Sequence, residues 1–120
     1  MPFDLLIGGY GPGIFSTALD PAAPVADARD ASFLALSADG RQVAASLEST
    51  HRISLFTIAL PRLTPAGSNP SGGKGPCHVS FDDKAVLAAN YGDGVIARFP
   101  IASDGTLQPL TAAAPNEGGG

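Results

Sequence analysis

A hairpin-like pattern that occurs three times constrains the fold of this chain more than any other feature. In residues 5–19 and 86–100 an apolar run leads to a Tyr-Gly pair, and a glycine two residues further on opens a second apolar run. Residues 42–58 repeat the two runs with a longer connection between them. Asn90 follows the corresponding Ser46 by 44 residues, and four-stranded propeller blades repeat every ~40 to 45 residues. The repeat therefore predicts a β-propeller.

The apolar runs have the alternation of strands that are covered on both sides. In residues 53–58 apolar side chains occur on both alternating faces, as expected of a sheet packed between two neighbours. The runs are bounded by turn sequences such as Asp-Gly, and they are too short for unsupported helices. We therefore expect an all-β fold of four-stranded antiparallel blades.

The chain is predicted to hold about two and a half blades of one partial β-propeller domain. The first blade covers about 3–28, with strands at 3–9 and 14–19 and a weak outer strand near 24–28. The second covers about 31–67, with strands at 32–37, 42–47 and 53–58 and a poor outer strand near 62–66. The third covers about 76–112, with strands at 77–81, 86–90, 95–100 and 106–111. Open blade edges and faces predict poor solubility or self-association.

Composition limits the partners and the compartment. The net charge of −4 and the lack of a Lys/Arg run argue against nucleic acid or an anionic membrane surface as a partner. No basic, apolar leader opens the chain and no run of ~20 apolar residues could span a bilayer, so we expect a cytoplasmic protein. Cys77, the one cysteine, cannot form an internal disulfide and is expected to be a small packed side chain. One cysteine and two histidines are too few to predict a metal site.

Several segments closely resemble the seven-bladed β-propeller lactonase family, which includes propeller-type 6-phosphogluconolactonases. They are ASFLALSADGR at 31–41, GPCHVSF at 75–81, AANYG at 88–92, and FPI at 99–101 with DGTL at 104–107. The resemblance runs from residue 5 to residue 118 but covers only about the N-terminal third of a family member. It implies hydrolysis of a sugar lactone in the pentose phosphate pathway without metal or organic cofactor. Two departures are Ser46, where the family has asparagine, and the missing turn glycine after Asp83.

Lactone hydrolysis needs a base that activates water and donors aimed at the oxyanion. His78 begins an inner strand and could face the central channel, where it would bind substrate or move a proton. Glu48 lies in the loop between two strands and could act as a base or bind a sugar hydroxyl. These two are the predicted catalytic residues. The alternatives are an imidazole bonded between blades and a solvated loop carboxylate.

Tyr10, Asn90 and Tyr91 are the predicted substrate-binding residues, because they precede the tight turns at the ends of blade strands. The alternative is that they hydrogen-bond a neighbouring blade. His51 shares the loop of Glu48 and is expected to be an exposed polar residue. Three basic residues could meet a phosphate but are more commonly surface solubilisers: Arg52, Lys74 and Arg98. The segment SGGKGP at 71–76 has the wrong spacing for a P-loop and is predicted to connect two blades.

Three functions stay open at this stage. The first is a lactone hydrolase of the 6-phosphogluconolactonase type, as a piece whose activity would need further blades. The second is a non-catalytic propeller fragment or interaction module that binds a partner through its open edges. The third is a muconate cyclase-like member of the same family. A small sugar lactone is the expected ligand of the completed enzyme.

Overall fold

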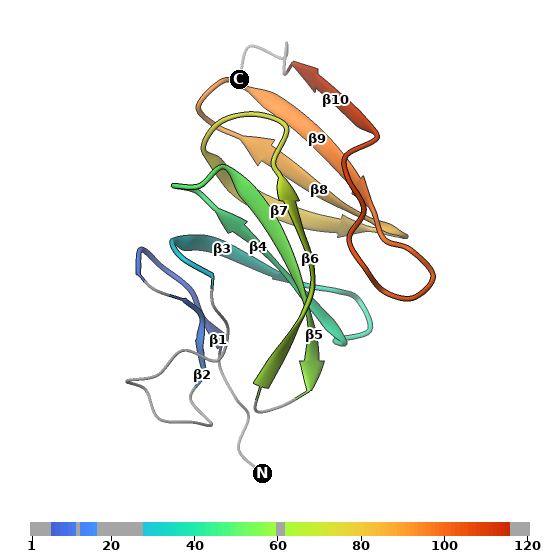
Figure 1. Cartoon of the computed structure of the whole chain (residues 1–120). Coiled ribbons are helices and arrows are strands. Elements are labelled where there is room, and N and C mark those ends of the chain that lie inside the picture. The colour runs from blue at the N-terminus through green and yellow to red at the C-terminus, as the bar shows by residue number, and fades with distance from the viewer. Residues whose placement is uncertain (1–5, 12, 17–27, 60–61, 116–120) are drawn as a thin grey trace.

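The structure is a computed structural model that describes residues 6–11, 13–16, 28–59 and 62–115. Strands in this part form three antiparallel sheets that follow one another along the chain (Figure 1). A hairpin of β1 (Leu6–Ile7) and β2 (Phe15–Ser16) comes first. The second sheet has β3 (Ala31–Leu36), β4 (Gln42–Leu47), β5 (Arg52–Ala59) and β6 (Arg62–Pro70). The third has β7 (Pro76–Asp82), β8 (Ala85–Asn90), β9 (Val95–Pro100) and β10 (Ala112–Pro115).

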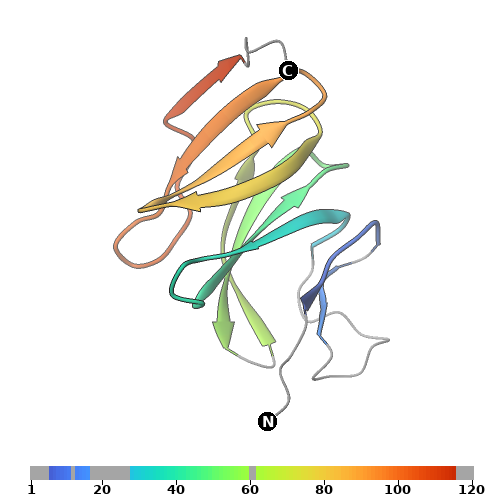
Figure 2. The ribbon, with the colours of Figure 1, turned by 180° about the vertical axis from the view of Figure 1, so that it is seen from behind.

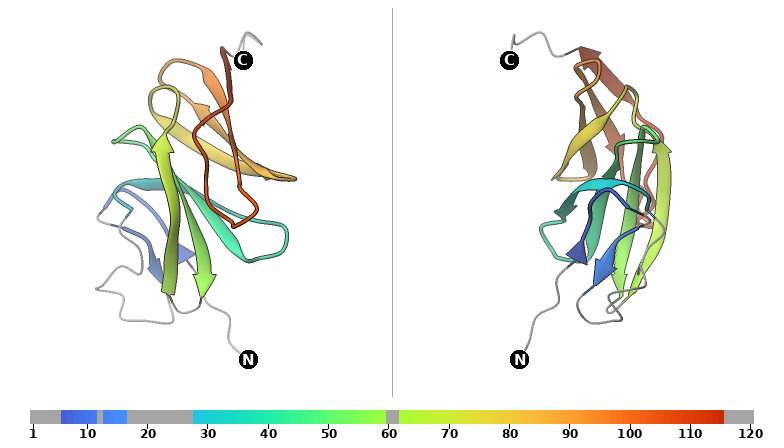
Figure 3. Two further views of the ribbon diagram at one scale, coloured as in Figure 1. Left: turned by 45° about the vertical axis from the view of Figure 1, so that its right-hand side comes forward. Right: turned by 90° about the vertical axis from the view of Figure 1, so that its left-hand side faces the viewer.

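Each four-stranded sheet is a meander in which consecutive strands are neighbours. The innermost strands β3 and β7 lie beside each other (Figure 2, cyan and gold). The hairpin, the second sheet and the third sheet are stacked face to face in chain order (Figure 3). This arrangement confirms the prediction of an all-β fold and a partial β-propeller.

The second sheet is buried on both faces. Val43 and Phe56 belong to a first core, which lies between the hairpin and the second sheet. Ala44 and Leu55 belong to a second core, which lies between the second and third sheets. Because neighbouring residues of a strand point to opposite faces, β4 and β5 supply both cores. The two-sided covering predicted from residues 53–58 is therefore present.

The hairpin approaches the second sheet closely at Gly8 and Gly9. The Gly9 N–H donates to the Ala31 carbonyl oxygen over 2.7 Å. A Cβ atom at Gly8 would overlap that same carbonyl oxygen, so only glycine allows this approach. The predicted strands at 3–9 and 14–19 lie partly outside the described residues, as does most of the weak strand near 24–28.

The outer strand of the third sheet differs from the prediction. It was expected at 106–111, but β10 covers 112–115 and pairs with residues 95–98 of β9. Leu107 instead reaches the second sheet, where its N–H donates to the Ala66 carbonyl oxygen over 2.8 Å. Its side chain is 5% exposed in the second core. Leu107 keeps a single antiparallel bridge to Ile101 of its own sheet, and its side chain is buried between the two sheets.

The contact of Leu107 with the second sheet requires room on β6. Gly67 has φ of +116°, and a Cβ there would lie 3.0 Å from the Leu107 carbonyl oxygen. The Gln42 side-chain amide also donates to the Gly105 carbonyl oxygen over 2.9 Å. The loop at 101–111 therefore bonds to the outer strand of the second sheet and connects the two sheets. β6 itself differs from the prediction, because it extends to residue 70 instead of ending near 66.

We predict that Leu107→Ala lowers the free energy of unfolding by about 2 to 4 kcal/mol, because it leaves a cavity in the second core. Leu36→Ala removes the same atoms from a side chain that is 62% exposed and should cost at most about 0.5 kcal/mol. Chemical denaturation of both variants measures the difference. Equal effects would show that Leu107 does not join the sheets.

Candidate functional site

All of the predicted site residues lie toward one end of the stacked sheets. The ladders pair Ala31 with Leu47 and Pro76 with Asn90, so β3 and β7 begin where β4 and β8 end. We call this end A. The opposite end, where Leu36 pairs with Val43 and Asp82 with Ala85, is end B. Catalytic groups on connecting loops are positioned by the strands that precede them.

The structure brings Tyr10 and Glu48 together at end A. The Tyr10 hydroxyl donates to Glu48 Oε1 over 2.9 Å, although 38 residues separate the two. The Glu48 backbone N–H donates to the Asp30 carbonyl oxygen over 3.1 Å, which ties its turn to the start of β3. The carboxylate and the phenol are thus held by two different sheets.

The Glu48 hydrogen bond, followed by its negative charge, raises the pKa of Tyr10 above the ordinary value. Burial and the charges of Asp30 and Cys77 raise it slightly further. The phenol therefore stays protonated at neutral pH and keeps donating to the carboxylate.

His78 is exposed, and its ring packs against Phe33 of the neighbouring inner strand. The ring centroids are 4.5 Å apart with the planes tilted by 38°. Both residues follow a register shift, between Ala31 and Phe33 in β3 and between Pro76 and His78 in β7. Such bulges redirect side chains near functional sites. The sequence indicated His78 but gave no signal for Phe33, which has the ordinary character of a strand residue.

Asn90 and Tyr91 have opposite environments. Asn90 is 1% exposed, and its amide donates to the carbonyl oxygens of Ser71 (3.0 Å) and Val95 (3.1 Å). Its buried Oδ1 atom has no partner in the described part of the protein. Tyr91 is 85% exposed, and only its backbone is fixed, by a bond from its N–H to the Gly75 carbonyl oxygen. Direct ligand contact stays a prediction for both, and burial favours a positioning role for Asn90.

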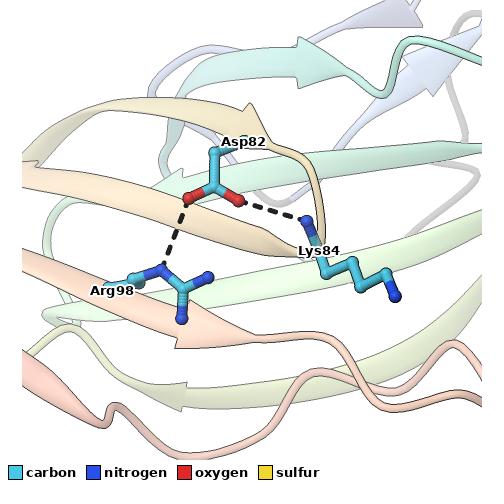
Figure 4. A network of polar contacts seen from close by, with 3 residues as sticks. All are labelled: Asp82, Lys84 and Arg98. Carbon is cyan, nitrogen blue, oxygen red and sulfur yellow. Dashed lines mark hydrogen bonds and ion pairs between the residues drawn. The ribbon is translucent and has the colours of Figure 1, made fainter.

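The basic residues that could meet a phosphate divide between the two ends. His51, Arg52 and Lys74 line one hollow of about 470 Å³ at end A. Arg98 forms an ion pair with Asp82 toward end B, with Nε 3.3 Å from Oδ2 (Figure 4). The other carboxylate oxygen accepts the Lys84 backbone N–H over 3.1 Å. An ion pair this exposed contributes at most about 1 kcal/mol and serves the fold of the turn.

A larger hollow, of about 940 Å³, lies at end B. Its lining includes Asp39, Asp83, Lys84 and Phe81 but none of the predicted site residues. The described residues contain no group of three or more His, Cys, Asp or Glu side chains that could bind a metal ion. In the same part of the chain no helix is long and apolar enough to cross a membrane.

Comparison with known proteins places the chain among lactonases. The family model described as "Lactonase, 7-bladed beta-propeller" matches residues 15–120. A 6-phosphogluconolactonase of Bacillus subtilis (strain 168) is 46% identical over 50 residues, which is 40% of this chain and 14% of that protein.

Solved structures show the same likeness. A protein from Bacteroides uniformis, assigned provisionally as a 6-phosphogluconolactonase, matches 93% of this chain with a TM-score of 0.81 and 30% identity. A protein from Bacteroides fragilis with the same provisional assignment matches 93% of this chain with a TM-score of 0.82 and 27% identity. A periplasmic gluconolactonase from Pseudomonas aeruginosa, at 21% identity over 92% of this chain and a TM-score of 0.77, shares the fold. The chain spans 36% to 38% of the length of these three structures.

We predict that Glu48→Gln lowers the pKa of Tyr10 toward its ordinary value of 10.0, because the carboxylate charge is lost. The bond between Tyr10 and Glu48 is complete below that value and is lost as the pH rises through the raised pKa. Tyr91→Phe leaves Tyr10 as the one tyrosine, so the ultraviolet absorbance of the phenolate reports it alone. An identical titration with and without Glu48→Gln would show that the two side chains do not interact.

Asn90→Ala is expected to lower the free energy of unfolding by about 1 to 3 kcal/mol, because two carbonyl groups lose their donor. Tyr91→Ala, at the adjacent exposed position, should change it by less than about 0.5 kcal/mol. Thermal or chemical denaturation compares the two. A neutral Asn90→Ala would argue against the positioning role.

Proposed function

The chain belongs to the family of seven-bladed β-propeller lactonases, and we propose that it contributes to a lactone hydrolase of the 6-phosphogluconolactonase type. The observation that carries this proposal is the bonded pair of Tyr10 and Glu48 at the same end of the sheets as His78. A carboxylate and an imidazole beside exposed aromatic rings suit hydrolysis of a sugar ester.

In the proposed reaction Glu48 takes a proton from water as the water oxygen bonds the lactone carbonyl carbon. The tetrahedral intermediate then collapses and breaks the bond between the carbonyl carbon and the ring oxygen. His78 gives that oxygen a proton, and exchange with solvent restores both side chains. The products are the free hydroxyl and the carboxylic acid, so one water molecule is consumed for each lactone opened.

The remaining predicted residues are proposed to hold the sugar. Tyr10 and Tyr91 are 75% and 85% exposed and can offer ring faces and hydroxyl groups to a polyol. Phe33 would keep the His78 ring in place by packing against it. Asn90 would act through the turn that carries Tyr91, since its amide bonds Val95 after that turn and Ser71 in the connection between β6 and β7.

We also propose that the protein acts in the cytoplasm as part of carbohydrate metabolism. The single cysteine supports this compartment, since no internal disulfide is available. The name of the Bacillus relative supports the pathway, because a 6-phosphogluconolactone is an intermediate of sugar oxidation.

A second candidate is association through the outer face of the third sheet. Val86 and Ala97 point into the second core, so their strand neighbours Leu87 and Ile96 lie on the opposite face. Ile96 is 46% exposed there. An apolar face of this kind favours contact with another copy of the chain or with further propeller blades.

One experiment separates the two candidates: measuring the molar mass in solution by light scattering while assaying hydrolysis of 6-phosphogluconolactone. We expect Glu48→Gln to lower kcat/KM by about a hundredfold and His78→Asn by at least about tenfold, as for loss of a general base or acid. Asp83→Asn, an exposed carboxylate at end B, is the matched control and should leave activity unchanged.

Full activity in Glu48→Gln would contradict the assigned base. An inactive chain that forms heterogeneous oligomers, with an Ile96→Ser variant that stays monomeric, would favour the association candidate.

A further inference from the structure

The hollow of about 470 Å³ at end A is lined by hydrogen-bond donors from two segments, the turn before β5 and the connection between β6 and β7. Thr50, His51 and Arg52 come from the turn before β5 and from its first residue. Gly73 and Lys74 come from the connection between β6 and β7. His51 lies three residues after Glu48 in the same turn, so one turn carries part of the hollow and the proposed base. None of these residues has a part in the reaction described above.

His51 is fixed so that its ring presents a hydrogen-bond donor. Its Nδ1 accepts the Gly75 N–H over 2.9 Å, and its carbonyl oxygen accepts the Ser71 N–H over 2.9 Å. Since Nδ1 accepts a hydrogen bond, the ring carries its proton on Nε2, and this nitrogen is a donor. The backbone φ of +57° is uncommon for a residue with a side chain, and the two bonds hold it there.

Arg52 and Lys74 supply the positive charge. The Arg52 guanidinium already donates from Nε and Nη2 to Ser68, over 3.1 and 3.0 Å, which fixes its plane and leaves Nη1 free of these bonds. The Lys74 carbonyl oxygen accepts the Gly92 N–H over 2.8 Å, so the backbone beneath its side chain is anchored as well. Planar guanidinium groups and ammonium groups are the usual partners of phosphate oxygens.

Asp93 and the glycines determine how a ligand can enter. A Cβ at Gly73 would lie 2.7 Å from Asp93 Oδ1 and 2.8 Å from Asn90, so this wall of the hollow must be bare backbone. The Asp93 carboxylate oxygen faces the Val95 N–H at 3.4 Å. Arg52 and Lys74 outnumber this one carboxylate, which leaves the hollow net positive. It therefore suits a small anion attached to a larger neutral group better than a polyanion.

We propose that this hollow binds the phosphate group of a phosphorylated sugar lactone. The inference rests on the proposed lactone hydrolase and adds the residues that would select the phosphorylated substrate. His51 and Arg52 line the hollow from the turn before β5 and Lys74 from the connection between β6 and β7, so donors on two sides could bond the tetrahedral oxygens of a phosphate monoester. The sugar ring would then extend toward Glu48 along the turn that both residues share.

The test compares hydrolysis of 6-phosphogluconolactone with hydrolysis of unphosphorylated gluconolactone. Lys74→Gln should raise KM for the phosphorylated lactone about fivefold to tenfold with kcat unchanged, the usual effect of losing one exposed charged hydrogen bond. KM for the unphosphorylated lactone should not change. Lys84→Gln is the matched control at end B, where the lysine bonds only through its backbone. Equal changes for both substrates, or none, would overturn the proposal.

A binding measurement keeps the proposal separate from catalysis. Titration of 6-phosphogluconate should shift the NMR signals of His51 and of the Gly72–Gly75 amides, and Lys74→Gln should weaken this binding about fivefold. This result in an inactive chain would reject the hydrolase and retain the phosphate site. Inorganic phosphate that binds as tightly as 6-phosphogluconate and ignores Lys74→Gln would indicate an adventitious ion only. No shift with either probe would likewise overturn the site.

Discussion

Burial of the second sheet on both faces is the constraint on which the rest of the structure depends. Adjacent residues of β4, such as Val43 and Ala44, enter different cores, so the sheet is stable only with a neighbour on each side. Stacked and twisted sheets converge at their inner strands and diverge at their outer ones. Convergence brings β3 beside β7 and puts Phe33 against His78. Divergence leaves the space that Leu107 fills from outside.

The repeat and the alternation of side chains were sufficient to locate the strands that pack in the cores. The predicted strands at 42–47 and 95–100 coincide with β4 and β9, because their apolar residues carry the signal directly. The outer strand at 106–111 was wrong for a physical reason. Leu107 is as compatible with a strand of its own blade as with the gap beside Gly67. Which position Leu107 adopts depends on the distance between the two sheets, and a local sequence pattern does not predict that distance.

The candidate site was predicted in its residue types but not in its contacts. Glu48 and Tyr10 were singled out separately, and their hydrogen bond depends on the distance between two turns in different sheets. The packing of His78 on Phe33 depends on two bulges that leave no clear sequence signature. Substrate contact stays a prediction for Asn90, and the bonds of its amide to Ser71 and Val95 were not indicated by the sequence. Local sequence gives the chemistry available at a turn, and packing between sheets determines which groups meet.

The larger hollow lies at end B, where carboxylates such as Asp39 are hydrogen-bonded within their own turns. The Arg41 backbone N–H and the Ser37 hydroxyl lower the pKa of Asp39, and the Thr106 hydroxyl and N–H lower that of Asp104 at the same end. These bonds stabilise the turns between strands at end B. At end A the Glu48 carboxylate accepts a hydrogen bond from the Tyr10 hydroxyl and lies in the same turn as His51. The proposed reaction and the proposed phosphate site are placed at end A because of the residue types that meet there, and the size of a hollow does not decide between the two ends.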